Sequence, residues 1–177
     1  HGTVVNNQST IHTSITLRLG TATARYLDDK VPPGAIRTLR DDPAGFDEKY
    51  WAEGVQLGWT HLLVSEELGG GSASDNGVVD LSMIAYEFGR RAAPGPLLPN
   101  AVVAGALARG GGHDDVVAQL LAGEAIATWA TADVDHSDAP PLFHIRVEGS
   151  EIVLDGVRRP VESAATADFL LVSADTT

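Results

Sequence analysis

The stretch LLAGEAIATWA, residues 120–130, decides the fold class of this chain, because the spacing of apolar residues changes within it. Before it, over residues 14–122, apolar residues recur at the three- and four-residue spacing of helices. After it, they form the short runs and alternations that are typical of strands. Helices followed by strands, with no alternation between the two, predict an α+β fold.

Two helices can be placed from their own residues. The clearer one begins near Asp75 and ends at Arg90-Arg91, where cations complement the negative end of the helix dipole. An earlier helix is expected after Asp47, because aspartate accepts hydrogen bonds from the first amides of a helix. The residues expected to face the core from these two helices are Trp51, Val55, Leu81, Ile84, Ala85 and Phe88.

Three further helices complete an expected antiparallel bundle of five. The first helix carries an apolar stripe and ends at Pro32-Pro33, with a loop after it. Two shorter helices are expected at 101–108 and from His113 or Asp114 onward. The stripe of the first helix consists of Ile15, Leu19, Ala22 and Tyr26.

Four strands are expected after residue 124. Glu148-Gly149-Ser150 has the residue types of a hairpin turn and joins two of them. The change of pattern predicts a domain boundary between a helical region, 14–122, and a strand region, 123–177, and residues 1–13 are expected to form a flexible leader. The expected strands are 125–132, 143–147, 152–154 and a buried run at 168–174.

The charge and composition exclude several classes of protein. Twelve Lys and Arg residues against 24 Asp and Glu give a net charge of -12, which repels nucleic-acid phosphates and anionic lipid surfaces. We therefore predict no nucleic-acid and no membrane partner. The chain has no cysteine, so it has no disulfide and no thiolate site, in agreement with a cytoplasmic location. No apolar run approaches the roughly 18 residues that span a bilayer.

Single motifs do not identify a reaction. The six histidines lack the spacing of a metal site, so no metal is predicted. The glycine runs 69–71 and 110–112 lack the Lys-Ser/Thr of a phosphate-binding loop and are interpreted as turns. Glu66-Glu67 and Arg90-Arg91 are interpreted as a solvated carboxylate pair and a helix end rather than as ligand-binding groups.

Several motifs in order resemble the acyl-CoA dehydrogenase family over roughly residues 14–175. The order of the motifs is more specific than any one of them, and it implies a helical bundle followed by part of a β-barrel-like middle domain. The motifs are Gly58-Trp59-Thr60-His61-Leu62-Leu63-Val64, Ser65-Glu66-Glu67-Leu68-Gly69-Gly70, Glu87-Phe88-Gly89-Arg90, Ala93-Pro94-Gly95-Pro96, Leu120-Leu121-Ala122-Gly123-Glu124 and Ala167-Asp168-Phe169-Leu170-Leu171-Val172.

The resemblance implies FAD as cofactor and an acyl-CoA thioester as substrate. In this family a carboxylate removes the α-proton while the β-hydrogen leaves as hydride to the flavin. The usual catalytic glutamate belongs to a C-terminal helical domain that nothing in this sequence matches, so the catalytic residue is not assigned. The chain is then either a piece of a longer protein or a half-length subunit, in a homo- or hetero-oligomer with another subunit of the family.

The segments that contact the flavin in the family depart from its pattern here. The first keeps the aromatic residue as Trp129 but places Ala132 where the family has a hydroxyl. The second has Pro160 in place of the covering aromatic and Glu162 in place of a hydroxyl. The resemblance assigns cofactor binding, in degenerate form, to Trp129, Thr131, Ala132 and Glu162, and substrate binding to Ser137 and Asp138.

Three functional hypotheses stay open. The first is a subunit that takes part in α,β-desaturation of an acyl-CoA from lipid or steroid side-chain catabolism, with FAD shared with or held by a partner. The second is a non-catalytic, FAD-deficient structural subunit of a heteromeric enzyme. The third is a generic α+β binding domain.

Overall fold

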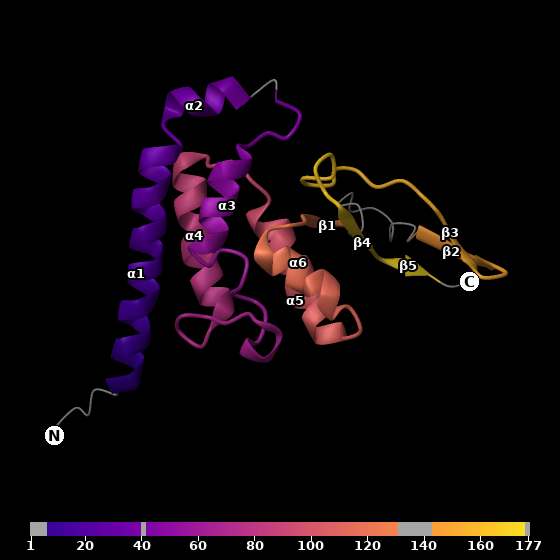
Figure 1. Cartoon of the computed structure of the whole chain (residues 1–177), viewed down its shortest axis with the longest axis horizontal. Coiled ribbons are helices and arrows are strands. Elements are labelled where there is room, and N and C mark those ends of the chain that lie inside the picture. The colour runs from indigo at the N-terminus through magenta and orange to yellow at the C-terminus, as the bar shows by residue number, and fades with distance from the viewer. Residues whose placement is uncertain (1–6, 40–41, 131–142, 176–177) are drawn as a thin grey trace, which may run out of the picture.

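The computed structural model describes residues 7–39, 42–130 and 143–175. Helices come first in the chain and strands follow. Figure 1 shows the helices on one side of the molecule and the strands on the other. The predicted α+β class is therefore confirmed. The helical elements are α1 (Asn7–Lys30), α2 (Pro33–Thr38), α3 (Glu48–Gln56), the short 3₁₀ helix η2 (Glu66–Leu68), α4 (Gly77–Arg91), α5 (Leu97–Gly110) and α6 (Asp114–Ala122).

Side-chain caps set the beginnings of the two helices that the sequence placed best. The Asp47 carboxylate accepts a 2.7 Å hydrogen bond from the amide of Tyr50, as expected for the start of α3. The side-chain oxygen of Asn76 accepts a 3.2 Å hydrogen bond from the amide of Val79 and begins α4, one residue after the expected Asp75. Both caps satisfy amides that have no partner inside the helix.

Three helix boundaries differ from the expectation. Helix α1 begins at Asn7, inside the expected leader 1–13, because polar residues such as serine and glutamine cost little in a helix that is already formed. Helix α2 occupies part of the expected loop, with Pro33 at a first-turn position where its fixed backbone angle favours a helix. Helix α5 begins at Leu97 rather than 101, because its Pro99 lies in the first turn.

The first and fourth helices run in the same direction, whereas α3 runs antiparallel to both (Figure 1). Gly20 of α1 lies beside Met83 of α4, and eight residues further along each helix Asp28 pairs with Arg91. The antiparallel expectation thus applies to α3 against its neighbours. The pair α1 and α4 is parallel because α2, α3 and the segment after them return the chain to the same end.

The expected stripe of α1 is confirmed at Leu19 and Tyr26, which pack against the core, and is wrong at Ala22, while the side chain of Ile15 lies outside the described residues. Ala22 is exposed, whereas Thr23 and Leu27 are completely buried. Gly20 and Thr23 also lie on the buried face. An apolar pattern does not include them, because glycine has no side chain and threonine carries a hydroxyl. In α3 and α4, the residues expected to face the core are buried, except that Ala85 is half-buried.

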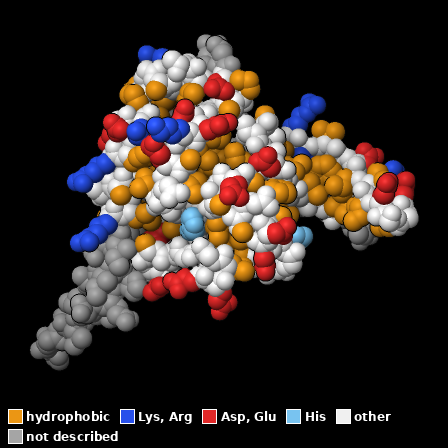
Figure 2. All heavy atoms as spheres, in the orientation of Figure 1, with side chains coloured by type: hydrophobic (Ala, Val, Ile, Leu, Met, Phe, Trp, Pro, Cys, Tyr) orange, Lys and Arg blue, Asp and Glu red, His pale blue; other side chains and the backbone are white. Residues whose placement is uncertain are grey.

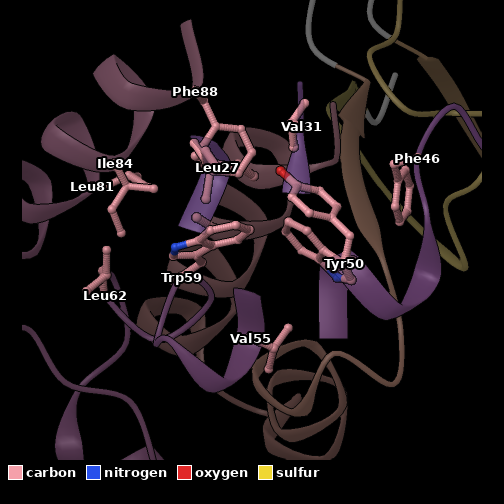
Figure 3. Close-up of a cluster of buried hydrophobic side chains, with 13 residues drawn as sticks. Leu27, Val31, Phe46, Tyr50, Val55, Trp59, Leu62, Leu81, Ile84 and Phe88 are labelled. Atoms are coloured by element: carbon pink, nitrogen blue, oxygen red, sulfur yellow. The ribbon is translucent and has the colours of Figure 1, made fainter. Parts of the chain in front are cut away.

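Trp59 forms the centre of the helical core (Figure 3). It is completely buried, and its ring makes edge-to-face contacts with Tyr26, Tyr50 and Phe88 at centroid distances of 5.6, 5.8 and 4.8 Å. Such contacts stabilise by about 0.5–1.5 kcal/mol each beyond the burial of area. Helices α1, α3 and α4 are therefore held around one indole ring.

The described residues form five strands where four were expected, and these strands make two small sheets. β1 (Ala127–Ala130) pairs in parallel with β4 (Phe169–Val172), with Trp129 opposite Leu171. The second sheet has the order β3-β2-β5, in which β2 (Phe143–Glu148) pairs antiparallel with β3 (Glu151–Asp155) and parallel with β5 (Ala174–Asp175). The predicted hairpin at residues 148–150 is confirmed.

The first strand pair is packed onto the helices. A second core cluster joins residues of α5 and α6 to Ala127, Phe169 and Leu171. The expected burial of the whole run 168–174 is wrong, since Leu170 is 53% exposed. One face of the pair is covered by helices, and among the described residues little covers Leu170 on the other face.

Candidate functional site

The beginning of β1 is fixed by two polar side chains from distant parts of the chain. Asn100 of α5 is completely buried; its Oδ1 accepts a 3.0 Å hydrogen bond from the amide of Ala127, and its Nδ2 donates to the Leu120 carbonyl at 3.4 Å. The Asp168 carboxylate accepts a 2.9 Å hydrogen bond from the amide of Ile126. These contacts position the strand that leads into the segment proposed to contact the flavin.

Asn100 was not singled out from the sequence. An asparagine after a proline at the start of a helix has the pattern of an ordinary first turn. Its partners are 20 and 27 residues away in the chain, so no local pattern reveals them. The Ala-Asp pair of the family-like strand at 167–168 is the one signal that pointed to the Asp168 contact.

Trp129 is the third of the four residues of β1 and is 37% exposed. Its indole N–H donates a 3.2 Å hydrogen bond to the Ser173 hydroxyl. The preceding residue, Thr128, is 1% exposed, and its hydroxyl donates a 2.6 Å hydrogen bond to the Glu162 carbonyl. The side chains of the two β1 residues project to opposite faces, because side chains alternate along a strand.

The structure therefore brings Trp129 and the Glu162 backbone to the same strand but to opposite faces of it. The Glu162 residue is exposed, and so is the neighbouring Pro160. The four other predicted site residues, Thr131, Ala132, Ser137 and Asp138, lie outside the described residues. Their assignments to cofactor and substrate stay predictions.

The segment before Pro160 is held against the second sheet. The Arg158 guanidinium lies over the ring of Phe143, 4.7 Å from its centroid. A cation above an aromatic face is stabilised by about 0.5–2 kcal/mol. This contact connects the second flavin-like segment to β2.

The described residues at the end of β1 do not fit an FAD on their own. A flavin ring requires hydrogen-bond donors, and its diphosphate requires cations or free amides. Here the Trp129 indole N–H is bound to Ser173, the Thr128 hydroxyl is buried on the other face, and the exposed Glu162 adds a negative charge. An FAD at this edge needs donors from elsewhere.

A cavity of about 450 Å³ lies between α3 and the lead into β1. Its apolar wall includes Phe46, Trp51 and Ile126, and its charged residues are all acidic. Phosphates and carboxylates are repelled by such a lining. The acidic residues that line it are Glu48, Glu124 and Asp168.

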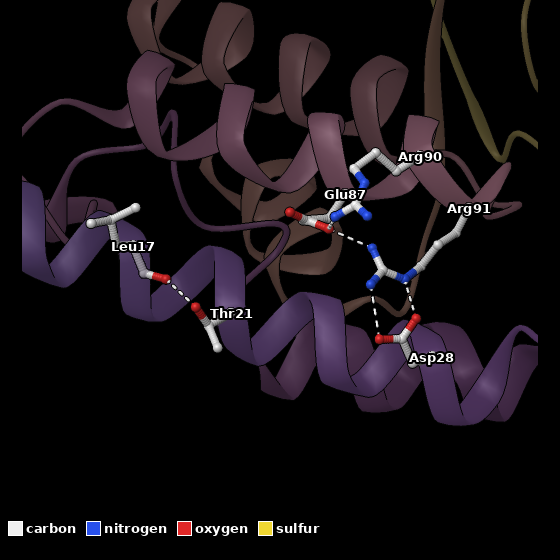
Figure 4. A network of polar contacts seen from close by, with 6 residues as sticks. All are labelled: Leu17, Thr21, Asp28, Glu87, Arg90 and Arg91. Carbon is white, nitrogen blue, oxygen red and sulfur yellow. Dashed lines mark hydrogen bonds and ion pairs between the residues drawn. The ribbon is translucent and has the colours of Figure 1, made fainter.

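The Arg90-Arg91 pair is engaged within the bundle (Figure 4). The Arg91 guanidinium donates to both oxygens of Asp28, at 2.6 and 2.9 Å, and also bonds to Glu87. Arg90 lies 3.5 Å from the same glutamate. Hydrogen bonding to Arg91 also lowers the pKa of Asp28. These contacts join α1 to α4 and support the structural interpretation of the arginine pair.

Hydrophobic side chains are exposed over the strands, where Figure 2 shows them gathered at one end of the molecule. In the hairpin, Val147 lies opposite Ile152, and these residues are 72% and 68% exposed. Helix α5 also exposes Leu98 and Val102. Neighbouring exposed apolar side chains such as Val147 and Ile152 are typical of a face that a partner or another domain covers.

Two kinds of site are absent from the described residues. Within 7–39, 42–130 and 143–175, no group of three His, Asp or Glu side chains is arranged to hold a metal ion. In the same part of the chain, no helix has the length and apolar character to cross a bilayer.

A sequence model of the acyl-CoA dehydrogenase N-terminal domain matches residues 16–122. No match is found among curated proteins. Solved structures with the same fold include the following three. A variant of the Tcur3481–Tcur3483 steroid ACAD has a TM-score of 0.81 and 26% identity, over 93% of this chain and 46% of that one.

The ChsE4–ChsE5 complex from Mycobacterium tuberculosis has a TM-score of 0.76 and 25% identity, over 92% of this chain and 44% of that one. A glutaryl-CoA dehydrogenase from Mycobacterium smegmatis in complex with FADH2 has a TM-score of 0.68 over 91% of this chain and 42% of that one. Its 16% identity supports the fold alone. The chain spans less than half the length of these structures.

Proposed function

The chain belongs to the acyl-CoA dehydrogenase family, and from that premise we propose that it takes part in the FAD-dependent α,β-desaturation of an acyl-CoA thioester as part of a hetero-oligomer. The observation that carries the proposal is the family match over the helical domain, continued into the strands by fold similarity over 93% of the chain. The generic binding domain considered from the sequence is thereby set aside.

We propose that this chain supplies the helical base and the first strand of the site, while FAD is held with a partner subunit. Two similar structures are named as pairs of proteins, Tcur3481–Tcur3483 and ChsE4–ChsE5. The engaged indole N–H of Trp129 supports this division, because it donates to Ser173 and not to a ligand on the exposed face of β1. The exposed apolar faces of α5 and the hairpin give a partner surface to cover.

For the substrate, we propose an acyl-CoA with a bulky apolar acyl group of the steroid type. The support is the name of one similar structure, a steroid ACAD, at 26% identity. The acidic cavity beside α3 does not suit the phosphates of coenzyme A, which supports a proposed position of the thioester at the β1 edge rather than in that cavity.

The alternative is a structural subunit that stabilises a flavin-bearing partner without contacting its substrate. The exposed Glu162 carboxylate and the degenerate flavin segments favour this alternative. Both proposals predict a partner of the same family, but only the first predicts that side chains of this chain reach the flavin.

One purification tests both proposals. The tagged chain is isolated from its source cells with its bound partners, and flavin absorbance is recorded before and after addition of steroid-type and linear acyl-CoAs. Bleaching of the flavin supports desaturation, and a slower rate of bleaching after Trp129→Ala supports a contribution from this chain. Bleaching that this variant leaves unchanged supports the structural alternative. A preparation with neither flavin nor a family partner contradicts both.

A further inference from the structure

Two helices, α3 and α6, end at one cavity. The last residue of α3, Gln56, and the last residue of α6, Ala122, both line a cavity of about 550 Å³ together with His61 and Glu124. The final carbonyl groups of a helix lack partners within it and carry a partial negative charge. Most of these carbonyls accept hydrogen bonds from the amides that follow each helix or from the side chains of Thr60 and Asn100. The negative dipole ends together with the Glu124 carboxylate make the cavity electronegative.

The hydrogen bonds of Thr60 fix the tautomer of His61. The Thr60 hydroxyl oxygen lies 2.8 Å from the Leu121 carbonyl oxygen and 3.1 Å from the His61 Nδ1. A carbonyl only accepts, so the hydroxyl donates its one proton to Leu121 and accepts from Nδ1–H. The Nε2 atom of the neutral ring then carries a lone pair.

The lining of this cavity is rich in acceptors and has no Lys or Arg among its described residues. It combines two helix C-termini, the Glu124 carboxylate and the imidazole of His61. The His61 ring stays neutral near pH 7, because partial burial lowers its pKa. A positively charged group is the ligand that such a set of acceptors stabilises.

The size of the cavity favours an organic cation over a bare metal ion. Among the described residues, no three side chains are grouped as metal ligands, and this cavity has one histidine and one carboxylate. We propose that the cavity between the ends of α3 and α6 binds an ammonium or guanidinium group. This site is separate from the β1 edge and does not depend on the proposed desaturation.

The cation has two possible sources, a Lys or Arg side chain of a partner subunit or a free amine. The test uses the full chain purified with its bound partners, and the chain alone if it purifies alone. Butylammonium chloride is titrated while the ring proton signals of His61 are followed by NMR, with sodium chloride at equal ionic strength as the reference. We expect a saturable shift with butylammonium that sodium chloride does not produce.

Two variants test whether the NMR shift reports binding in the cavity or an effect of net charge. Glu124→Gln removes the carboxylate of the cavity and is expected to weaken butylammonium binding about three- to tenfold. Glu67→Gln removes an exposed carboxylate outside the cavity and is expected to leave binding unchanged. Equal loss in the two variants overturns the site, because the effect is then one of net charge.

Carbodiimide cross-linking separates the two sources. A cross-link from Glu124 to a lysine of a bound subunit identifies a partner side chain as the cation. Saturable butylammonium binding to the intact complex, without such a cross-link, identifies a free amine as the ligand. The absence of both the specific shift and the cross-link overturns the proposal.

Discussion

The indole N–H of Trp59 donates a 3.2 Å hydrogen bond to the hydroxyl oxygen of Thr23, and both side chains are completely buried. This bond joins α1 to the segment that follows α3, across 36 positions of the chain. It also explains why a threonine, rather than the neighbouring Ala22, faces the core. A buried indole N–H without an acceptor is costly, so the position requires an oxygen.

Thr23→Val is therefore expected to destabilise the helical domain by about 1–3 kcal/mol, because it keeps the shape but leaves the Trp59 N–H without a partner. Denaturant unfolding monitored by circular dichroism measures the change. Thr23→Ser keeps the hydroxyl and should retain more stability than the valine variant. Equal stability of the valine and serine variants would show that the bond contributes nothing.

Gly54 and Gly89 form a matched pair of helical glycines. A Cβ on Gly54 would lie 2.1 Å from two ring atoms of Trp59, whereas a Cβ on Gly89 meets nothing within 4 Å. Gly54→Ala is expected to destabilise by about 1–3 kcal/mol or more through overpacking. Gly89→Ala is expected to stabilise by about 0.5–1 kcal/mol, because alanine favours a helix over glycine. Opposite shifts in melting temperature check the pair.

Ile84 tests the packing of α4 against the core. It is completely buried, and Ile84→Ala is expected to cost about 2–5 kcal/mol from lost burial and the cavity left behind. Tyr86 on the same helix is 61% exposed, so Tyr86→Ala serves as a control with a small effect. An unchanged melting temperature for the Ile84 variant contradicts the assignment of this helix face.

The pKa of His61 links stability to pH. Burial lowers its pKa in the folded chain below the ordinary value of 6.5, so the unfolded chain binds the proton more tightly. The contribution of the neutral ring is therefore fully present above pH 6.5, and it is lost as the pH falls toward the lowered pKa. Unfolding free energies measured across this range should decline less steeply in His61→Gln than in the unsubstituted chain.

Sequence patterns correctly predicted the elements whose buried residues are mostly apolar. Asp47, Trp51 and Val55 place α3, because a cap and an apolar stripe agree there. The same reasoning placed Leu19 and Tyr26 of α1 correctly but missed Gly20 and Thr23, because the fit of these two residues depends on partners far away in the chain. Burial of a strand likewise depends on what covers it.

The sequence predicted where the candidate site lies but not the hydrogen bonds within it. The family-like motifs brought attention to β1 and Glu162, but no spacing could show that Thr128 and Trp129 use their donors within the chain. Asn100, which holds both β1 and the end of α6, was missed for the same reason. Long-range polar contacts leave no periodic signal in a sequence.

The flavin content of the chain is the last prediction. Purified without a partner, the chain is expected to be colourless, because Ala132 and Glu162 lack the hydroxyls of the family pattern, Pro160 lacks its covering aromatic ring, and Glu162 adds a negative charge. A flavin ring left without donors loses about 0.5–1.5 kcal/mol for each missing hydrogen bond. The ratio of flavin to protein absorbance measures the content for the chain alone and for the chain purified with its partner.

Restoring the family residues makes this prediction sharper. Ala132→Thr and Glu162→Thr, combined with Pro160→Trp, should raise the flavin ratio in the complex and leave the isolated chain colourless, because the partner supplies the remaining donors. Arg37→Gln, a change on α2 away from the strands, is the control and should leave the ratio unaltered. Stoichiometric FAD on the unsubstituted chain alone would show that the two segments were aligned wrongly with the family, since the engaged donors then lie outside the flavin site.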